Sequence, residues 1–337
     1  MKRTALVIGA TGGVGGETAA ALLRHGWDVR ALHRNPDHAR KQSPELGVTW
    51  VKGDAMDAAS VLAAALGADW IADVIVHGAN PPGYRNWKGT AVPMLESTIA
   101  AAERVGARIV FPGTVYNYAP DTFSRVAEDA PQAPVTRKGK IRVEMERRLE
   151  ASKARVLIVR AGDFFGPRVA NSWFGQGLVK PHRPFASVMY PGTREVGHAW
   201  AYLPDLAETF ARLLDREDDL PRFARFHFRG HHFARGVEIA EAARHAAGVP
   251  DAPIRAFPWF AVYLLSPFVE TFRELIEMRY LWKQDLELVN DELVAFLGAE
   301  PHTRLETALR ETLRGMGVLP GASPSISDHP KATRLAS

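Results

Sequence analysis

A glycine-rich turn near the start of the chain constrains the fold more than any other stretch of the sequence. The apolar run Ala5–Ile8 is typical of a buried strand, and Glu17–Arg24 is typical of a helix. Three glycines separate them at three-residue spacing, at Gly9, Gly12 and Gly15. Glycine lets a ligand approach the backbone closely, and the start of a helix presents N–H groups to an anion. We therefore predict dinucleotide binding here, with an ordinary tight turn as the alternative.

Composition limits the remaining function classes. The chain has 337 residues, of which 46% are hydrophobic and 24% charged, a balance typical of globular proteins. The net charge of +4 is too small to indicate nucleic-acid binding, and the lack of cysteine excludes disulfides and thiolate chemistry. The apolar stretch Trp259–Leu265 is too short to span a bilayer, and the first strand begins too early for a signal peptide. We expect a cytoplasmic protein with no nucleic-acid or membrane partner.

Strand-like and helix-like segments alternate through the first half of the chain. Further strands are expected at Asp28–His33, Val48–Lys52, Asp73–His77, Arg108–Phe111 and Arg155–Val159. Helices are expected at Asp57–Leu66, Thr90–Val105 and Arg137–Ala151. This alternation predicts an α/β fold with a Rossmann-type, doubly wound parallel sheet. A ligand of such a sheet lies across the carboxyl ends of the strands.

The pattern loosens after about residue 162. We expect a dinucleotide-binding domain at 1–162, a smaller and mostly helical substrate lobe at 163–318, and a tail at 319–337. Residues 196–214 are expected to return to the first domain. A strand is expected at Arg222–Phe228. Helical segments are expected at Pro204–Leu214, Val237–Ala247, Pro258–Glu277 with an interruption at Pro267, Gln284–Leu297 and Thr303–Arg314.

Five segments together resemble the extended short-chain dehydrogenase/reductase family, which includes NAD(P)-dependent epimerases and dehydratases. They are the glycine motif Gly9–Gly15, Gly53-Asp54 after the third strand, Arg160–Pro167, Tyr202–Ala207, and Leu297-Gly298 followed by Pro301 and Leu305. The likeness extends over nearly the whole chain. It implies a dinucleotide cofactor held by the first domain and a substrate covered by the second.

Arg34 determines which cofactor we expect. No acid lies between Val29 and Asn35, where a carboxylate would accept hydrogen bonds from the ribose of NAD. An arginine can instead pair with the 2′-phosphate of NADP, so we predict NADP over NAD. A solvated loop charge is the alternative interpretation of Arg34. The predicted cofactor-binding residues are Gly9, Thr11, Gly12, Gly13, Val14, Gly15, Arg34, Asp54, Ala79 and Lys140.

Two of these residues have specific roles or alternatives of their own. The family resemblance implies that Asp54 faces the adenine, and a cap on the following helix is the alternative. Ala79 ends the fourth strand, so its backbone is expected to pass close to a ribose.

The family's catalytic Tyr-x-x-x-Lys pair is incomplete in this chain. The resemblance places Lys140 at the lysine position, where it would hold the nicotinamide ribose, but Thr136 stands at the tyrosine position. A surface pair between Lys140 and Glu144 is the alternative. Thr114 corresponds to the family's hydroxyl residue. Candidate proton donors in place of the tyrosine are Tyr116, Tyr118, Asp163, His182 and Lys140, and Tyr116 could equally be a packing residue.

These residues lead to three hypotheses about function. The first is an NADP-dependent oxidoreductase acting on the carbonyl or hydroxyl group of a small, partly apolar substrate, with Thr114, Lys140 and Tyr116 as catalytic candidates. The second is a nucleotide-sugar epimerase or dehydratase. The third is an NADP(H)-binding redox sensor without turnover, which the absent tyrosine favours.

The remaining expectations concern partners and the second lobe. No metal site is expected, and the helices Thr90–Gly106 and Arg137–Ala151 could form a homodimer seam. Aromatic residues that either line a substrate pocket or form core are Phe164, Phe165, Trp173, Phe174, Phe185, Trp200, Trp259 and Phe260.

Overall fold

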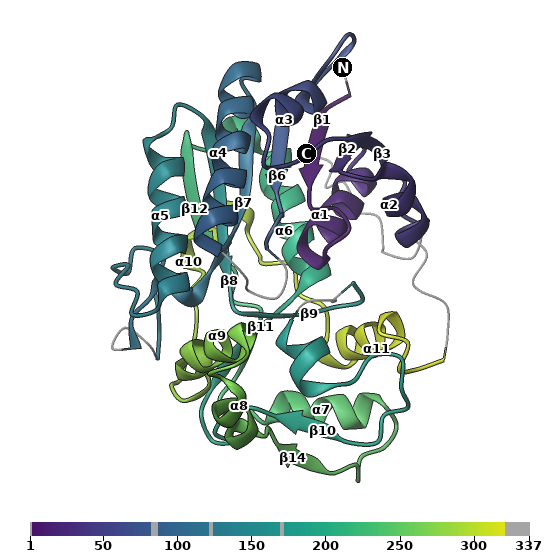
Figure 1. Cartoon of the computed structure of the whole chain (residues 1–337), viewed down its shortest axis with the longest axis vertical. Coiled ribbons are helices and arrows are strands. Elements are labelled where there is room, and N and C mark those ends of the chain that lie inside the picture. The colour runs from purple at the N-terminus through teal and green to yellow at the C-terminus, as the bar shows by residue number, and fades with distance from the viewer. Residues whose placement is uncertain (1, 82–86, 121–123, 169–171, 321–337) are drawn as a thin grey trace.

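A seven-stranded, all-parallel sheet forms the centre of the protein (Figure 1). The computed structural model describes residues 2–81, 87–120, 124–168 and 172–320. The strand order is β12-β8-β7-β6-β1-β2-β3. The strands are β1 (Thr4–Ile8), β2 (Asp28–His33), β3 (Thr49–Lys52), β6 (Val74–His77), β7 (Arg108–Thr114), β8 (Arg155–Ala161) and β12 (Phe223–His227). The predicted doubly wound sheet is confirmed.

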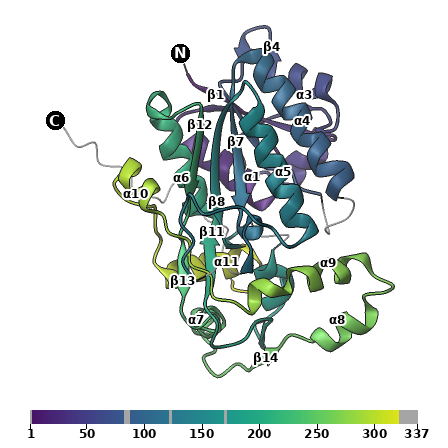
Figure 2. The same cartoon turned by 90° about the vertical axis from the view of Figure 1, so that its left-hand side faces the viewer.

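Helices cover both faces of this sheet, because alternate residues of each strand point to opposite sides. One core contains Val7 and Leu157 of the sheet with α1 (Gly13–Arg24) and α6 (Leu203–Asp215). The other contains Leu6 and Ile158. That second face is covered by α3 (Ala58–Ala65), α4 (Trp87–Val105) and α5 (Arg137–Ala151). In Figure 2, α6 lies on one side of the sheet and the helices α3, α4 and α5 lie on the other.

Small elements border the sheet. Near β3 lies the short helix α2 (Pro36–Gln42), and β4 (Leu66–Gly67) forms a hairpin with β5 (Trp70–Ile71). Neither α2 nor the hairpin is predicted by the periodicity of the sequence, because both are too short to establish a period.

The described part of the lower lobe contains four short α-helices and five short strands. Its three-stranded sheet has the order β13 (His231–Phe233), β11 (His198–Tyr202) and β9 (Asp163–Phe165). A second pair joins β10 (Val188–Tyr190) to β14 (Ile254–Ala256). The helices are α7 (Glu238–Ala246), α8 (Trp259–Leu265), α9 (Glu270–Met278) and α11 (Leu305–Gly315), whereas α10 (Asp291–Leu297) packs against the sheet strand β12 through Phe296 and Phe226. Within the described chain, no helix combines the length and the apolar character needed to cross a membrane.

The helix expected over Gln284–Leu297 is wrong in its first half, because only α10 is helical. Residues 284–290 are not helical, and Leu288 forms a parallel bridge with Val126. Leu286 and Leu288 are buried while their neighbours are partly exposed, so the segment has the period of two that is typical of a strand. Most of the expected tail, residues 321–337, lies outside the described residues.

An ion-pair cluster fastens the end of α1 to the end of α6, and it makes stability depend on pH. The Nδ1 atom of His25 lies 2.6 Å from Asp215 Oδ2, and its Nε2 atom lies 3.3 Å from both Glu208 carboxylate oxygens. These hydrogen bonds to Asp215 and Glu208 raise the pKa of His25 from 6.5 to about 9. In the folded state His25 therefore stays protonated over a pH range in which it is neutral in the unfolded chain.

Stability should consequently fall as pH rises. Below 6.5 the cluster contributes fully, and its contribution is lost between pH 6.5 and about 9, because the folded state then holds one proton more than the unfolded state. We expect a loss of about 2 kcal/mol in the free energy of unfolding, measured by urea denaturation at both ends of that range. His25→Gln should remove this pH dependence, whereas the exposed His38→Gln should retain it. An unchanged slope in His25→Gln would refute the assignment.

Candidate functional site

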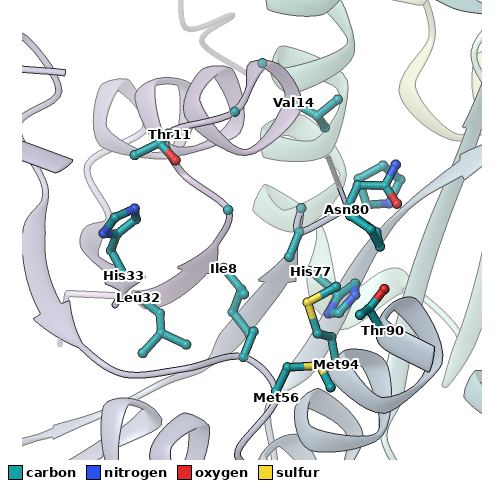
Figure 3. Close-up of a pocket in the computed structure, with 18 of the residues that line it drawn as sticks. Ile8, Thr11, Val14, Leu32, His33, Met56, His77, Asn80, Thr90 and Met94 are labelled. Carbon is teal, nitrogen blue, oxygen red and sulfur yellow. The ribbon is translucent and has the colours of Figure 1, made fainter. Parts of the chain in front are cut away.

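A cavity of about 750 Å³ opens at the carboxyl ends of the central strands (Figure 3). It lies where a parallel sheet is expected to bind its ligand. Figure 3 shows Thr11 and Val14 on one side of this cavity and Met56, Thr90 and Met94 on the other. The lining includes Gly9, Thr11, Gly12, Gly13, Val14, Arg34, Asp54, Ala79, Thr114 and Arg142, together with His33, His77, Asn80 and Phe164.

The glycine turn has the form of a cradle for phosphate. Gly12 is the N-cap of α1, its backbone makes no side-chain cap hydrogen bond, and no acid occupies the first helical turn. The first N–H groups of the helix therefore point outward without a competing side chain. Gly9 has a φ of +88°, and a Cβ there would lie 2.7 Å from the carbonyl carbon of Gly78. A Cβ on Gly15 would collide with the carbonyl oxygen of Gly9. Gly15 thus supports the turn by packing, although it does not line the cavity.

Two of the predicted contacts beyond the glycine turn, Arg34 and Asp54, lie at one end of the cavity. Arg34 follows β2 and is exposed at the cavity wall. Asp54 follows β3, and its Oδ1 atom accepts a hydrogen bond of 3.0 Å from the N–H of Met56. The cap of helix α3 is instead Asp57, which accepts from the N–H of Ala59 at 3.0 Å. Asp54 is therefore not the cap of that helix, and it is among the residues that line the cavity.

His77 lines the same cavity, and it is not among the residues predicted from the sequence. Its Nδ1 atom lies 2.8 Å from the hydroxyl oxygen of Thr98, and the residue is 2% exposed. Burial, and next the positive charge of Arg142, lower its pKa to about 3, so the ring is neutral at physiological pH. Within the described residues, His77 Nε2 makes no hydrogen bond. The only sequence signal for this residue is a histidine that ends an apolar strand.

Helix α5 presents Arg142 to the cavity, not Lys140. The Thr136 hydroxyl caps the helix by accepting a hydrogen bond of 3.0 Å from the N–H of Gly139. Lys140 is exposed and is not among the residues that line the cavity. The buried face of α5 passes through Lys138, Arg142, Met145 and Leu149. Lys140, which the family resemblance places at the position of the catalytic lysine, therefore does not face the cavity. The spacing back from Met145 and Leu149 could have indicated Arg142.

The Arg142 guanidinium lies in a partly apolar setting at the end of the cavity away from Arg34. Its centre is 5.3 Å from the ring centroids of both Trp87 and Phe111. Its terminal nitrogens lie 3.4 Å from the carbonyl oxygen of Pro112 and 3.4 Å from the Asn80 side-chain oxygen. Arg142 is 8% exposed, so its charge acts through a medium of low dielectric constant. A negatively charged or polarised oxygen in this part of the cavity would be stabilised.

The other predicted catalytic residues separate into one that lines the cavity and several that do not. Thr114 ends β7 beside Arg142 and lines the cavity, with its hydroxyl 3.5 Å from Asn117 Oδ1. Tyr116 packs against a separate cluster that includes Met278 and Tyr280, and it does not line the cavity. The described lining residues include no tyrosine and no lysine.

The remaining proton-donor candidates lie elsewhere. Tyr118 is fully buried, and burial raises its pKa to about 12. Asp163 pairs with His198 at 2.8 Å. His182 is exposed, and its backbone N–H bonds to the carbonyl oxygen of Met316.

The aromatic residues of the second half divide in the same way. Phe164 lines the cavity, and Phe260 is exposed. Phe185 is partly buried against the main core. Those buried within that core are Phe165, Trp173, Phe174, Trp200 and Trp259.

A Rossmann sheet with an uncapped glycine turn at its cavity defines a dinucleotide-binding protein. Residues 9–168 match the family of NAD(P)H-binding proteins. The chain is 40% identical over 82 residues to an NmrA-like family domain-containing oxidoreductase, notA, from Aspergillus sp. (strain MF297-2), a match that spans about a quarter (24%) of each protein.

Solved structures with the same fold cover nearly the whole chain. UDP-glucose 4-epimerase from Bifidobacterium longum, in complex with NAD+ and UDP, has a TM-score of 0.70 and 15% identity, over 94% of this chain and 100% of that one. The Bordetella bronchiseptica enzyme WbmH, in complex with NAD+, has a TM-score of 0.67 and 21% identity over the same shares. These solved structures share the fold of this chain, and the match to the NAD(P)H-binding family covers the part of the fold that contains the glycine turn.

Proposed function

We propose that this protein is an NADP(H)-dependent oxidoreductase that acts on the carbonyl or hydroxyl carbon of a small, partly apolar substrate. The observation that carries the proposal is one continuous cavity, lined at one end by Arg34 and Asp54 and at the other by Thr114 and Arg142, with the glycine turn between them. The turn fits a pyrophosphate, because no side chain caps the start of α1 and no acid lies in its first turn, while Gly9 and Gly15 let the backbone of the turn pack closely.

Some residues of the chain would bind the cofactor, and others would polarise the reacting oxygen of the substrate. Arg34 would pair with a 2′-phosphate, and the start of α1 would hold the pyrophosphate. NADPH, when bound, supplies a hydride to the carbonyl carbon of the substrate. Thr114 would donate a hydrogen bond to the substrate oxygen, and Arg142 would stabilise the negative charge that develops there. An arginine keeps its proton, so Arg142 acts by its charge and the proton comes from another donor.

A binding protein without turnover is the second candidate, and a specific observation favours it. Thr136 is occupied as a helix cap and Lys140 lies outside the cavity, so the described lining has no phenol beside a lysine to serve as a general acid. Such a protein would bind NADPH and NADP with different affinities but would not consume NADPH with any carbonyl compound.

Cofactor choice can be tested by titrating the purified protein with NADPH and NADH while following cofactor fluorescence. We expect tighter binding of NADPH. Arg34→Ala should weaken NADPH binding roughly ten- to a hundredfold, because it removes a charge-assisted contact to phosphate, and should leave NADH binding unchanged.

The matched control for this titration is Arg40→Ala. Arg40 is an exposed arginine six residues further on that does not line the cavity, so its replacement should change neither affinity. Equal affinities for NADPH and NADH in the unmodified protein would exclude the NADP assignment. No binding of either would exclude both candidate functions.

A further inference from the structure

The helix α8 and the turn after it form an exposed apolar surface, here called the apolar tip. Phe260 and Phe268 are 82% and 85% exposed. The other members of the apolar tip, also exposed, are Tyr263, Leu264 and Leu265. Isolated exposed apolar side chains are common, but five within nine residues of one short segment form a contiguous patch. Such patches mark contact with a protein or a membrane.

Buried side chains on the inner side of α8 anchor this helix to the lower lobe. Trp259 is 9% exposed, and its indole N–H donates a hydrogen bond of 2.7 Å to the carbonyl oxygen of Pro191. Val262 is also buried, and the Trp259 ring packs against Trp173 and Phe257. Because α8 is apolar on its inner and outer sides alike, anchoring it to the lobe leaves the outer side chains in water. Both views place α8 at the lower edge of the molecule, away from the seven-stranded sheet (Figures 1 and 2).

Arginines border the apolar tip. Arg273 donates hydrogen bonds of 3.1 Å to the carbonyl oxygens of Ser266 and Pro267 at the turn. Arg279 lies over the Trp259 ring at 4.8 Å and donates to the Tyr263 hydroxyl at 3.0 Å. Arg255 is exposed just before the helix. Among the described residues, no carboxylate lies within ion-pair distance of these three arginines.

The local charge balance is therefore positive. Glu270 is the one acid in the sequence from 255 to 273. Glu274 and Glu277 on α9 face the other way, and they pair with Lys138 and Arg137. The apolar tip is therefore an apolar surface bordered by basic side chains.

We propose that the apolar tip binds the surface of an anionic lipid bilayer, with Phe260, Leu264 and Phe268 in the interfacial region and the arginines at the headgroups. Apolar and aromatic side chains beside basic residues are the composition that such interfacial segments use. The expectation of no membrane partner rests on the length of Trp259–Leu265, and surface contact does not need a segment that spans the bilayer.

A second copy of the chain fits this surface less well. The five side chains expose on the order of 600 Å² in total. A stable two-fold interface buries about 800 Å² on each partner. A two-fold axis through the tip would also bring one basic border against its equal, which is repulsive.

Vesicle sedimentation tests the proposal with the full-length protein. We expect it to sediment with vesicles of phosphatidylcholine mixed with phosphatidylglycerol, and much less with pure phosphatidylcholine. Phe260→Ser and Phe268→Ser should each lower the partition coefficient about tenfold or more, because each removes one inserted aromatic side chain. Arg255→Gln with Arg273→Gln should weaken binding only to the anionic vesicles. The matched control is Ile71→Ser, which removes an exposed apolar residue from the hairpin beside the sheet.

The outcomes distinguish a lipid bilayer from a second copy of the chain as the partner of the apolar tip. Loss of binding in the phenylalanine variants, with the control unchanged, supports the proposal. Equal binding of the unmodified protein and the phenylalanine variants overturns it, as does no binding by the unmodified protein. A dimer in light scattering that becomes a monomer in Phe260→Ser, without vesicle binding, would assign the surface to a second copy. NADPH titration of each variant reports whether the protein remains folded.

Discussion

Replacing Arg142 with glutamine should lower kcat/KM by about 10²–10³ while changing the affinity for NADPH little. The guanidinium lies in the cavity beside Thr114, next to two aromatic rings and largely out of solvent. A fixed positive charge in such a setting stabilises a developing oxyanion far more than it would in water. The measurement is NADPH consumption with the aldehyde or ketone that the unmodified protein reduces fastest.

Lys140→Gln is the matched control for Arg142→Gln. Lys140 lies on the same helix two residues earlier, but it is exposed and outside the cavity. We expect its replacement to leave kcat/KM within about twofold. If Lys140→Gln caused the large loss and Arg142→Gln did not, the family alignment would be right and the assignment to Arg142 wrong. NADPH binding to both variants shows that neither change has unfolded the site.

Replacing Arg160 with methionine should lower the free energy of unfolding by about 3–5 kcal/mol. Arg160 is fully buried, and its guanidinium bonds to the two carboxylate oxygens of Glu146 at 3.1 and 2.6 Å. It also donates a hydrogen bond of 2.5 Å to the hydroxyl oxygen of Tyr118. Without Arg160, the buried Glu146 carboxylate would lose its counter-charge, and that loss is the main cost.

The polar network around Arg160 explains why a single change should cost so much. His227 Nδ1 lies 3.2 Å and 3.1 Å from the carbonyl oxygens of Val126 and Val289, so this nitrogen carries the ring proton. His227 Nε2 is then the acceptor for the Tyr118 hydroxyl, at 2.6 Å. Asn117 donates a further hydrogen bond of 2.7 Å to Glu146. Each group in the network is therefore satisfied by a bond to its neighbour, and removing one group leaves its partners without that bond.

Urea denaturation with linear extrapolation measures the effect of Arg160→Met. Arg147→Met is the control, because Arg147 pairs with Glu144 on the exposed side of α5, the helix that carries Glu146, and its replacement should change the free energy of unfolding little. A cost for Arg160→Met no greater than that of the control would show that Glu146 is neutral or finds another partner.

The sequence predicted the central sheet well, because buried parallel strands are apolar runs separated by long amphipathic helices. It also placed Gly9, Arg34, Asp54 and Ala79 at the cavity, since each follows a strand whose carboxyl end must meet the others. The short strands of the lower lobe could not be predicted. A three-residue strand such as His231–Phe233 has no measurable period, and its pairing with β11 is decided by tertiary contacts.

The partners of Arg142 and Arg160 could not be predicted from the sequence for a different reason, although helical spacing can place Arg142 on the buried face of α5. A charged residue on a helix or strand is expected in solvent unless its partner is known. The partner of Arg160 lies 14 residues away on α5, and the surroundings of Arg142 come from three separate elements. The family resemblance favours Lys140 as the residue of α5 that faces the cofactor. The packing of Met145 and Leu149 instead fixes the rotation of α5 about its axis, and Arg142 faces the cavity.

The path of the chain limits how this architecture can be divided or recombined. After leaving for the lower lobe at β9, the chain returns to complete the sheet with α6 and the edge strand β12 before entering the lobe again. Residues 9–168, which match the NAD(P)H-binding family, exclude two strands of the sheet, β1 and β12, and the covering helix α6. Replacing the lower lobe to change substrate specificity would require two separate replacements, one before and one after residues 203–227. Variation in such a protein is therefore expected to accumulate within lobe segments and not through exchange of the whole lobe.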